Sequence, residues 1–194
     1  VLNDPNDLLS VGGFTFVEGG ILYSAFGYLK HFNANGGNRL KTTISGIDFS
    51  LGDENLHAET GALYFRHLTA DAKKYGVYEA RYGTEESVHE RLRECARKCY
   101  EHEAQIIDMM FEQGDQENCS AADMRVFVQS RIDICLNNLG IASMFNVDPA
   151  NNPIAKWFYS NIQGYKFVDF FHQVGKEYSR GWSEDLFEYA EFQA

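Results

Sequence analysis

The chain has 194 residues, 44% of them hydrophobic and 14% aromatic, which is enough for one sizeable core and makes a single domain the default. Its formal net charge of −11 argues against nucleic acid as a partner, because the phosphate backbone is bound by basic patches. No signal peptide is visible, and no apolar stretch is expected to reach membrane-spanning length, so no membrane partner is predicted. The four cysteines lack the dense spacing of a secreted disulfide scaffold, which favours a cytoplasmic location.

The periodic segments predict an all-α protein, because the three prolines fall outside them. A first helix is expected after residues 3–5, where an acidic cap precedes a proline, and it runs to about Phe32. The polar, glycine-rich residues 33–38 end this helix. A second long helix covers roughly residues 41–75 and stops at Gly76.

Two further helices and an aromatic segment follow along the chain. A third helix is expected over about residues 84–113 and ends at a glycine. Ser120 and Asp123 resemble a capping box and begin a fourth helix, which Gly140 closes. An aromatic-rich segment then occupies residues 157–171, where aromatic packing is the simplest interpretation.

One group of residues predicts a metal site. Glu54 and His57 are three apart in the second helix, so their side chains share a face. Glu18 lies in an apolar stretch of the first helix, where an unpaired carboxylate is costly. Two-metal sites in helical bundles combine Glu-x-x-His helices with single acids from other helices. The sequence therefore predicts half of a di-metal site, with the two carboxyl groups close together in a largely apolar interior and at least one protonated near neutral pH.

Other interpretations of these residue types are also open. A Glu-x-x-His pair on an exposed face would be an ordinary polar pair, since a short motif is weakly specific on its own. Cys95, Cys99 and His102 share a helical face and could hold a metal, but core or half-buried thiols are the simpler interpretation.

Three blocks of sequence belong together: Val17-Glu18-Gly19-Gly20-Ile21-Leu22-Tyr23-Ser24, Asp53-Glu54-Asn55-Leu56-His57, and the stretch from Asn152-Pro153-Ile154 through Phe170-Phe171 to Gly175-Lys176-Glu177-Tyr178. They resemble the small, radical-generating subunit of class I ribonucleotide reductase. The resemblance spans essentially the whole chain but only the C-terminal half of a complete family member. It implies an incomplete ferritin-like helical bundle over residues 1–180 and a flexible tail over residues 181–194.

The resemblance also implies roles for individual residues. Glu18, Glu54 and His57 match three of six metal ligands, for two iron ions or manganese. Asp53 matches an acid beside the site, on the radical-transfer route, that orients the opposite histidine ligand. Tyr178 matches the tyrosine that relays the radical to the large subunit. The implied reaction is the reduction of ribonucleoside diphosphates to deoxyribonucleotides.

The implied partners are the large subunit, which binds the tail, a second small subunit in a homodimer, and a missing N-terminal half. That half would supply the remaining ligands and the radical-bearing tyrosine, so the chain is expected to be a fragment or one product of a split gene. It is expected to be inactive without that half and the large subunit. The alternatives are another di-metal ferritin-like oxidase, or a non-catalytic fragment or scaffold that occupies the large subunit.

Overall fold

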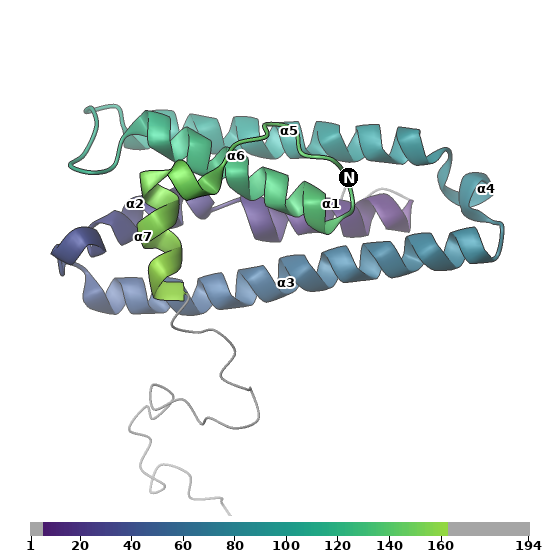
Figure 1. Cartoon of the computed structure of the whole chain (residues 1–194), viewed down its shortest axis with the longest axis horizontal. Coiled ribbons are helices and arrows are strands. Elements are labelled where there is room, and N and C mark those ends of the chain that lie inside the picture. The colour runs from purple at the N-terminus through teal and green to yellow at the C-terminus, as the bar shows by residue number, and fades with distance from the viewer. Residues whose placement is uncertain (1–5, 163–194) are drawn as a thin grey trace, which may run out of the picture.

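The structure, a computed structural model, describes residues 6–162, and these residues form helices and turns without a strand (Figure 1). In chain order the elements are α1 (Asp7–Gly20), α2 (Tyr23–His31), the 3-10 turn η1 (Ala34–Gly36), α3 (Lys41–Lys74), α4 (Tyr78–Tyr82), α5 (Glu85–Met110), α6 (Ala121–Asn138), the 3-10 turn η2 (Pro149–Asn151) and α7 (Pro153–Ile162). The all-α prediction is therefore confirmed. The expected cap at residues 3–5, most of the aromatic segment, Tyr178 and the tail over residues 181–194 lie outside the described residues.

Helix α1 occupies the centre of the bundle and packs against α3, α5 and α6. The long helices α3 and α5 follow the two long edges of the molecule in Figure 1 and are joined at one end by α4. Helix α7 packs against α2 and α6. The core is made of aliphatic and aromatic side chains from all these helices, among them Leu8, Leu9, Phe16, Leu51, Phe65, Leu92, Ile107, Phe127, Ile132 and Phe158.

Glycines allow α1 to lie close to its neighbours. A Cβ atom added at Gly19 would lie 2.5 Å from the Sγ of Cys135, and one added at Gly20 would lie 2.7 Å from the Cδ1 of Ile132. Real Cβ atoms are not found at such distances, so a side chain at position 19 would force α1 and α6 apart, and one at position 20 would require the end of the Ile132 side chain to move.

The prediction of one continuous helix up to Phe32 is wrong, because the chain breaks between α1 and α2. Leu22 takes a left-handed conformation with φ of 72°. The fully buried carboxylate of Glu103, from α5, accepts hydrogen bonds from the backbone N–H of Leu22 (3.1 Å) and of Ser24 (2.9 Å). A carboxylate at a helix N-terminus is stabilised by free amides and by the helix dipole, so Glu103 caps α2 and holds the break in place.

The other helix ends follow the sequence signals. Helix α3 stops just before Gly76, which has φ of +67°, and α6 is followed by Gly140 with φ of +79°. Thr84 caps α5, and the Ser120 hydroxyl accepts a 3.0 Å hydrogen bond from the backbone N–H of Asp123 at the start of α6. These ends depend on local backbone chemistry, which the sequence displays directly. The short helix α4 was not predicted.

The expectation that no apolar stretch reaches membrane-spanning length is wrong, because one stretch is long enough and apolar enough to do so. The stretch Asp7–His31 has 25 residues, its most apolar 18-residue window has a mean hydropathy of 1.3, and 56% of that window is buried inside the fold. One such stretch is weak evidence for a membrane span, because the buried core helix of a globular bundle passes the same test. Here it is divided into α1 and α2 and forms the centre of the bundle.

Candidate metal centre

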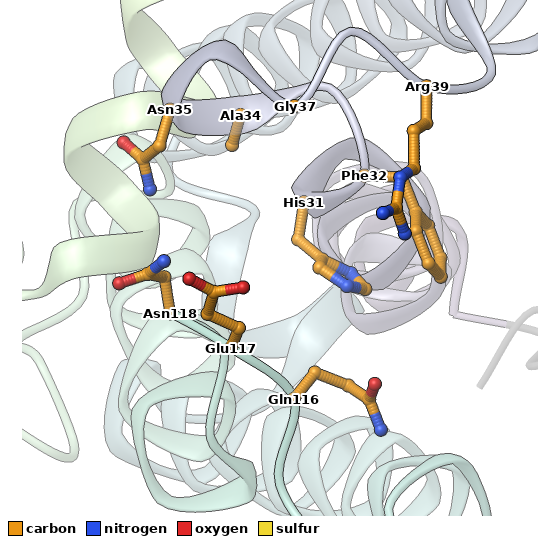
Figure 2. A pocket seen from close by; sticks show the side chains of 9 residues that line it. All are labelled: His31, Phe32, Ala34, Asn35, Gly37, Arg39, Gln116, Glu117 and Asn118. Atoms are coloured by element: carbon orange, nitrogen blue, oxygen red, sulfur yellow. The ribbon is translucent and has the colours of Figure 1, made fainter.

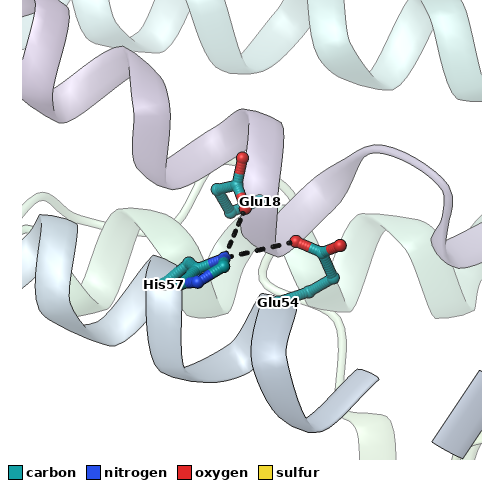
Figure 3. A group of neighbouring side chains, drawn as sticks. All are labelled: Glu18, Glu54 and His57. Atoms are coloured by element: carbon teal, nitrogen blue, oxygen red, sulfur yellow. Dashed lines mark hydrogen bonds and ion pairs between the residues drawn. The ribbon is translucent and has the colours of Figure 1, made fainter. Parts of the chain in front are cut away.

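The last turn of α1 and the middle of α3 bring Glu18, Glu54 and His57 together (Figure 3). The Nδ1 atom of His57 lies 3.0 Å from a carboxylate oxygen of Glu18 and 3.8 Å from one of Glu54. One possible ligand atom from each residue lies within 4.8 Å of the other two. The spacing in the sequence thus identified three side chains that converge, while their role as metal ligands stays a prediction.

The prediction that this group lies in a largely apolar interior is wrong. The side chains of Glu18, Glu54 and His57 are 18%, 27% and 54% exposed, respectively. Figure 3 shows Glu18 reaching from α1 toward Glu54 and His57 on α3, so the group lies at the seam between these two helices. The apolar neighbours of Glu18 in the sequence reflect the burial of the other faces of α1 against α5 and α6, and its own side chain emerges beside α3.

The two carboxyl groups influence each other, as their predicted proximity requires. A hydrogen bond with Glu18 raises the pKa of the Glu54 carboxyl above its ordinary value, and burial and the charge of Glu18 act in the same direction. The neighbouring His57 opposes this increase in pKa, while Asp53 adds to it. Asp53 itself is exposed on α3, one residue before Glu54.

Directly behind the group lies a buried polar network that the sequence analysis missed. The guanidinium of Arg131, from α6, donates to the backbone carbonyl of Gly19 (3.2 Å), to Oδ1 of Asn55 (3.0 Å) and to the hydroxyl of Tyr159 (3.1 Å). The hydroxyl of Tyr23 donates to the same Asn55 oxygen at 2.8 Å. An arginine within the apolar stretch of α6 was the signal in the sequence that could have revealed this network.

Tyr23 is held in its neutral form by its surroundings. Burial raises the pKa of the Tyr23 hydroxyl to about 12, against the opposing effect of the Arg131 cation. That cation lies 4.0 Å from the centre of the Tyr23 ring. Because the hydroxyl keeps its proton at neutral pH, it remains a hydrogen-bond donor to Asn55.

Cys95 and Cys99, which share a helical face with His102, are half-buried and buried thiols, respectively. The thiols of Cys95 and Cys99 are free, Cys99 is buried, and the His102 side chain is 55% exposed. A hydrogen bond between the two thiols lowers the pKa of Cys95 to about 7 and raises that of Cys99. Within residues 6–162, Glu18, Glu54 and His57 form the one group of three or more histidine, cysteine, aspartate or glutamate side chains arranged to hold a metal ion.

A cavity of about 420 Å³ lies at one end of the bundle, between the α2–α3 connection and the loop that joins α5 to α6 (Figure 2). Its lining consists of His31, Phe32, Ala34, Asn35, Gly37, Arg39, Gln116, Glu117 and Asn118. None of these residues belongs to the set of Glu18, Glu54 and His57 or to the Arg131 network, so the cavity is separate from the candidate metal centre.

Comparison with known proteins places this arrangement in a family. Residues 3–153 match the family model described as "Ribonucleotide reductase, small chain". A protein described as a probable ribonucleoside-diphosphate reductase small subunit, from Invertebrate iridescent virus 3, is 26% identical over 168 residues, which cover 85% of this chain and 41% of that relative. The chain thus spans about two fifths of the length of this curated relative. A helical bundle that joins a glutamate to a Glu-x-x-His pair fits this match, and the chain belongs to the ribonucleotide reductase small-chain family.

Proposed function

We propose that Glu18, Glu54 and His57 form part of the di-metal centre of a ribonucleotide reductase small subunit, which supplies the radical used to reduce ribonucleoside diphosphates to deoxyribonucleotides. The observation that carries this proposal is the convergence of two carboxylates and an imidazole from two helices within 4.8 Å, in a chain of this family.

The donor set fits the metals that such chemistry uses. Carboxylate oxygens suit hard cations, and an imidazole nitrogen favours iron or manganese over calcium. Metal ligation requires deprotonated carboxylates, so metal binding competes with protonation of Glu54, whose pKa is raised by its hydrogen bond with Glu18. When bound, the metal pair supplies one-electron oxidation. Glu18 and Glu54 then contribute negative charge, and His57 a neutral nitrogen ligand, at fixed positions on two packed helices.

Three ligands are too few for a two-metal site, which implies that further helices pack over the junction of α1 and α3. Bundle sites with two metals draw on four helices, whereas α1 and α3 supply three ligands. The exposed face of α3 beside His57 carries the apolar side chains of Leu56 (61% exposed), Leu63 (49%) and Tyr64 (56%). Helices that bring the remaining acid and a second Glu-x-x-His pair would bury these side chains and the ligands together.

The roles of the other residues follow from the same proposal. Asp53 orients a histidine ligand from the opposite side of the centre. Tyr178 relays the radical to the large subunit, to which residues 181–194 bind. Small subunits pair as a homodimer.

The proposal is tested by metal binding to the purified full chain. We expect weak binding of Mn²⁺, measured by the loss of the free-ion electron paramagnetic resonance signal. The variants Glu54→Gln and His57→Ala should abolish this binding, whereas Glu59→Gln, an exposed acid on the same helix, should leave it unchanged. We also expect iron content below two ions per chain and no stable radical until the complementary helices are added. Mn²⁺ binding that is absent in the wild-type chain, or unaffected by the two ligand variants, would refute the assignment.

A further inference from the structure

We propose that Arg131 is a positioning residue for the metal centre: through Gly19 and Asn55 it fixes the two chain segments that carry Glu18 and Glu54. This inference rests on the proposed function of those carboxylates.

The contacts of Arg131 fall on the residues that directly follow the two ligands. Its Nε atom donates to the carbonyl oxygen of Gly19, and one terminal nitrogen donates to Oδ1 of Asn55. Consecutive Cα atoms are only about 3.8 Å apart, so a group that holds the neighbour also restrains the ligand-bearing turn. One guanidinium therefore sets the separation between the end of α1 and the middle of α3.

The network is rigid enough for this purpose. Arg131 is only 6% exposed, and a planar guanidinium fixes the directions of its hydrogen bonds. Oδ1 of Asn55 receives a second hydrogen bond from the Tyr23 hydroxyl, whose ring lies under the guanidinium. Hydrogen bonds that share partners in a buried site reinforce one another.

Simple capping accounts for only part of this arrangement. The carbonyl of Gly19 lies in the last turn of α1, where carbonyls lack an amide partner within the helix, so a donor there is useful for stability alone. The bond to Asn55 serves no helix end, because Asn55 lies in the middle of α3. In addition, the hydrogen-bond partners of Arg131 among the described residues are uncharged, and a buried cation without a paired anion is a costly way to stabilise a bundle.

The test uses the full chain with the variants Arg131→Met and Asn55→Ala. The first readout is the ¹⁵N chemical shifts of the His57 imidazole in metal-free protein at fixed pH, which report its 3.0 Å contact with Glu18. The second is Mn²⁺ affinity by electron paramagnetic resonance. We expect both variants to change the His57 shifts and to weaken Mn²⁺ binding by about tenfold to a hundredfold, the usual effect of losing a group that orients a metal ligand.

Lys30→Met provides the matched control. Lys30 is also a buried cation that links helices, with a side chain 1% exposed and 2.5 Å from the Asp48 carboxylate, but it contacts neither ligand nor the residues next to them. This variant should lose stability and keep both the His57 shifts and the Mn²⁺ affinity.

The outcomes separate this inference from the proposed function. Unchanged His57 shifts in folded Asn55→Ala protein would overturn the positioning role, with or without metal, even if Arg131→Met fails to fold. If the wild-type chain binds no Mn²⁺ but both variants alter the His57 shifts, the metal assignment falls, while the placement of Glu18 against His57 by the Arg131 network is upheld.

Discussion

At the scale of single residues, the candidate centre is an arrangement that stability alone would not favour. Two carboxyl groups meet at the seam between α1 and α3, where the hydrogen bond with Glu18, burial and the charge of Glu18 raise the pKa of Glu54. The folded chain thus keeps like charges together at a place where a neutral pair would be more stable. Such conflicts between local stability and arrangement are typical of functional sites.

Glu54→Gln should therefore stabilise the metal-free chain at neutral pH. The folded-state pKa of Glu54 is raised, so its stabilising contribution is present below the unfolded pKa and is lost as the pH rises through the folded value. Glutamine mimics the protonated acid and can donate to Glu18 at any pH. We expect a gain below about 1 kcal/mol at pH 7, since the group is partly exposed, and this gain should shrink as the pH falls toward the raised folded-state pKa of Glu54.

Urea unfolding in the presence of a chelator at several pH values measures this effect. Glu59→Gln, which changes an exposed acid on the same helix, serves as the control and should shift the midpoint little at any pH. A Glu54→Gln chain less stable than the wild type at pH 7 would contradict the prediction.

The residues of the centre were predictable to different extents. Glu54 and His57 stand three apart on one helix, so their shared face follows from helix geometry. Their exposure did not follow, because it depends on which side of α1 packs against α3. Arg131 lies 112 residues from Gly19 and 76 residues from Asn55 in the chain. No local sequence pattern specifies hydrogen bonds between residues so far apart.

At the scale of helices, the same contrast appears at the break between α1 and α2. Capping residues mark the starts of α5 and α6, glycines follow the ends of α3 and α6, and the sequence predicted these ends. The break at Leu22 is held by a carboxylate 81 residues away. Gly19 and Gly20, just before it, weaken the helix locally, but the partner that fixes the break is a tertiary contact that the sequence does not display.

Glu103→Ala should destabilise the bundle by about 2–4 kcal/mol, because it leaves two buried backbone N–H groups without their charged acceptor. Thermal and urea unfolding, followed by circular dichroism, measure the loss. Glu101→Ala changes an exposed glutamate of α5 and should remain within about 0.5 kcal/mol of the wild type. Equal stability of the two variants would show that solvent satisfies the amides of Leu22 and Ser24.

At the scale of the whole molecule, the outer face of α3 exposes large apolar side chains to solvent. Leu56, Leu63 and Tyr64 are about half exposed or more, next to His57. Neighbouring apolar side chains on an open surface usually mark a face that packs against another protein segment. The net charge of −11 keeps copies of the chain apart in general, so any association should be localised to such a face.

Leu63→Glu should reduce self-association of the purified chain, because it places a charge in the middle of this face. Sedimentation velocity over a range of protein concentrations measures the change. Val77→Glu alters a side chain of similar exposure (44%) beyond the end of α3 and should leave association unchanged. An identical response of the two variants would mean that overall charge, and not this face, controls association.

The hydrogen bonds of Glu103 have a further consequence while the protein is being synthesised. Residues 7–31 leave the ribosome as one apolar stretch, long enough by composition to be mistaken for a membrane span. The acceptor that bends this stretch is made 72 residues after His31, a delay of roughly ten seconds at ordinary rates of translation. Until Glu103 has been made, residues 7–31 lack the buried acceptor that holds the break between α1 and α2, so this apolar stretch cannot complete its packing before that part of α5 emerges.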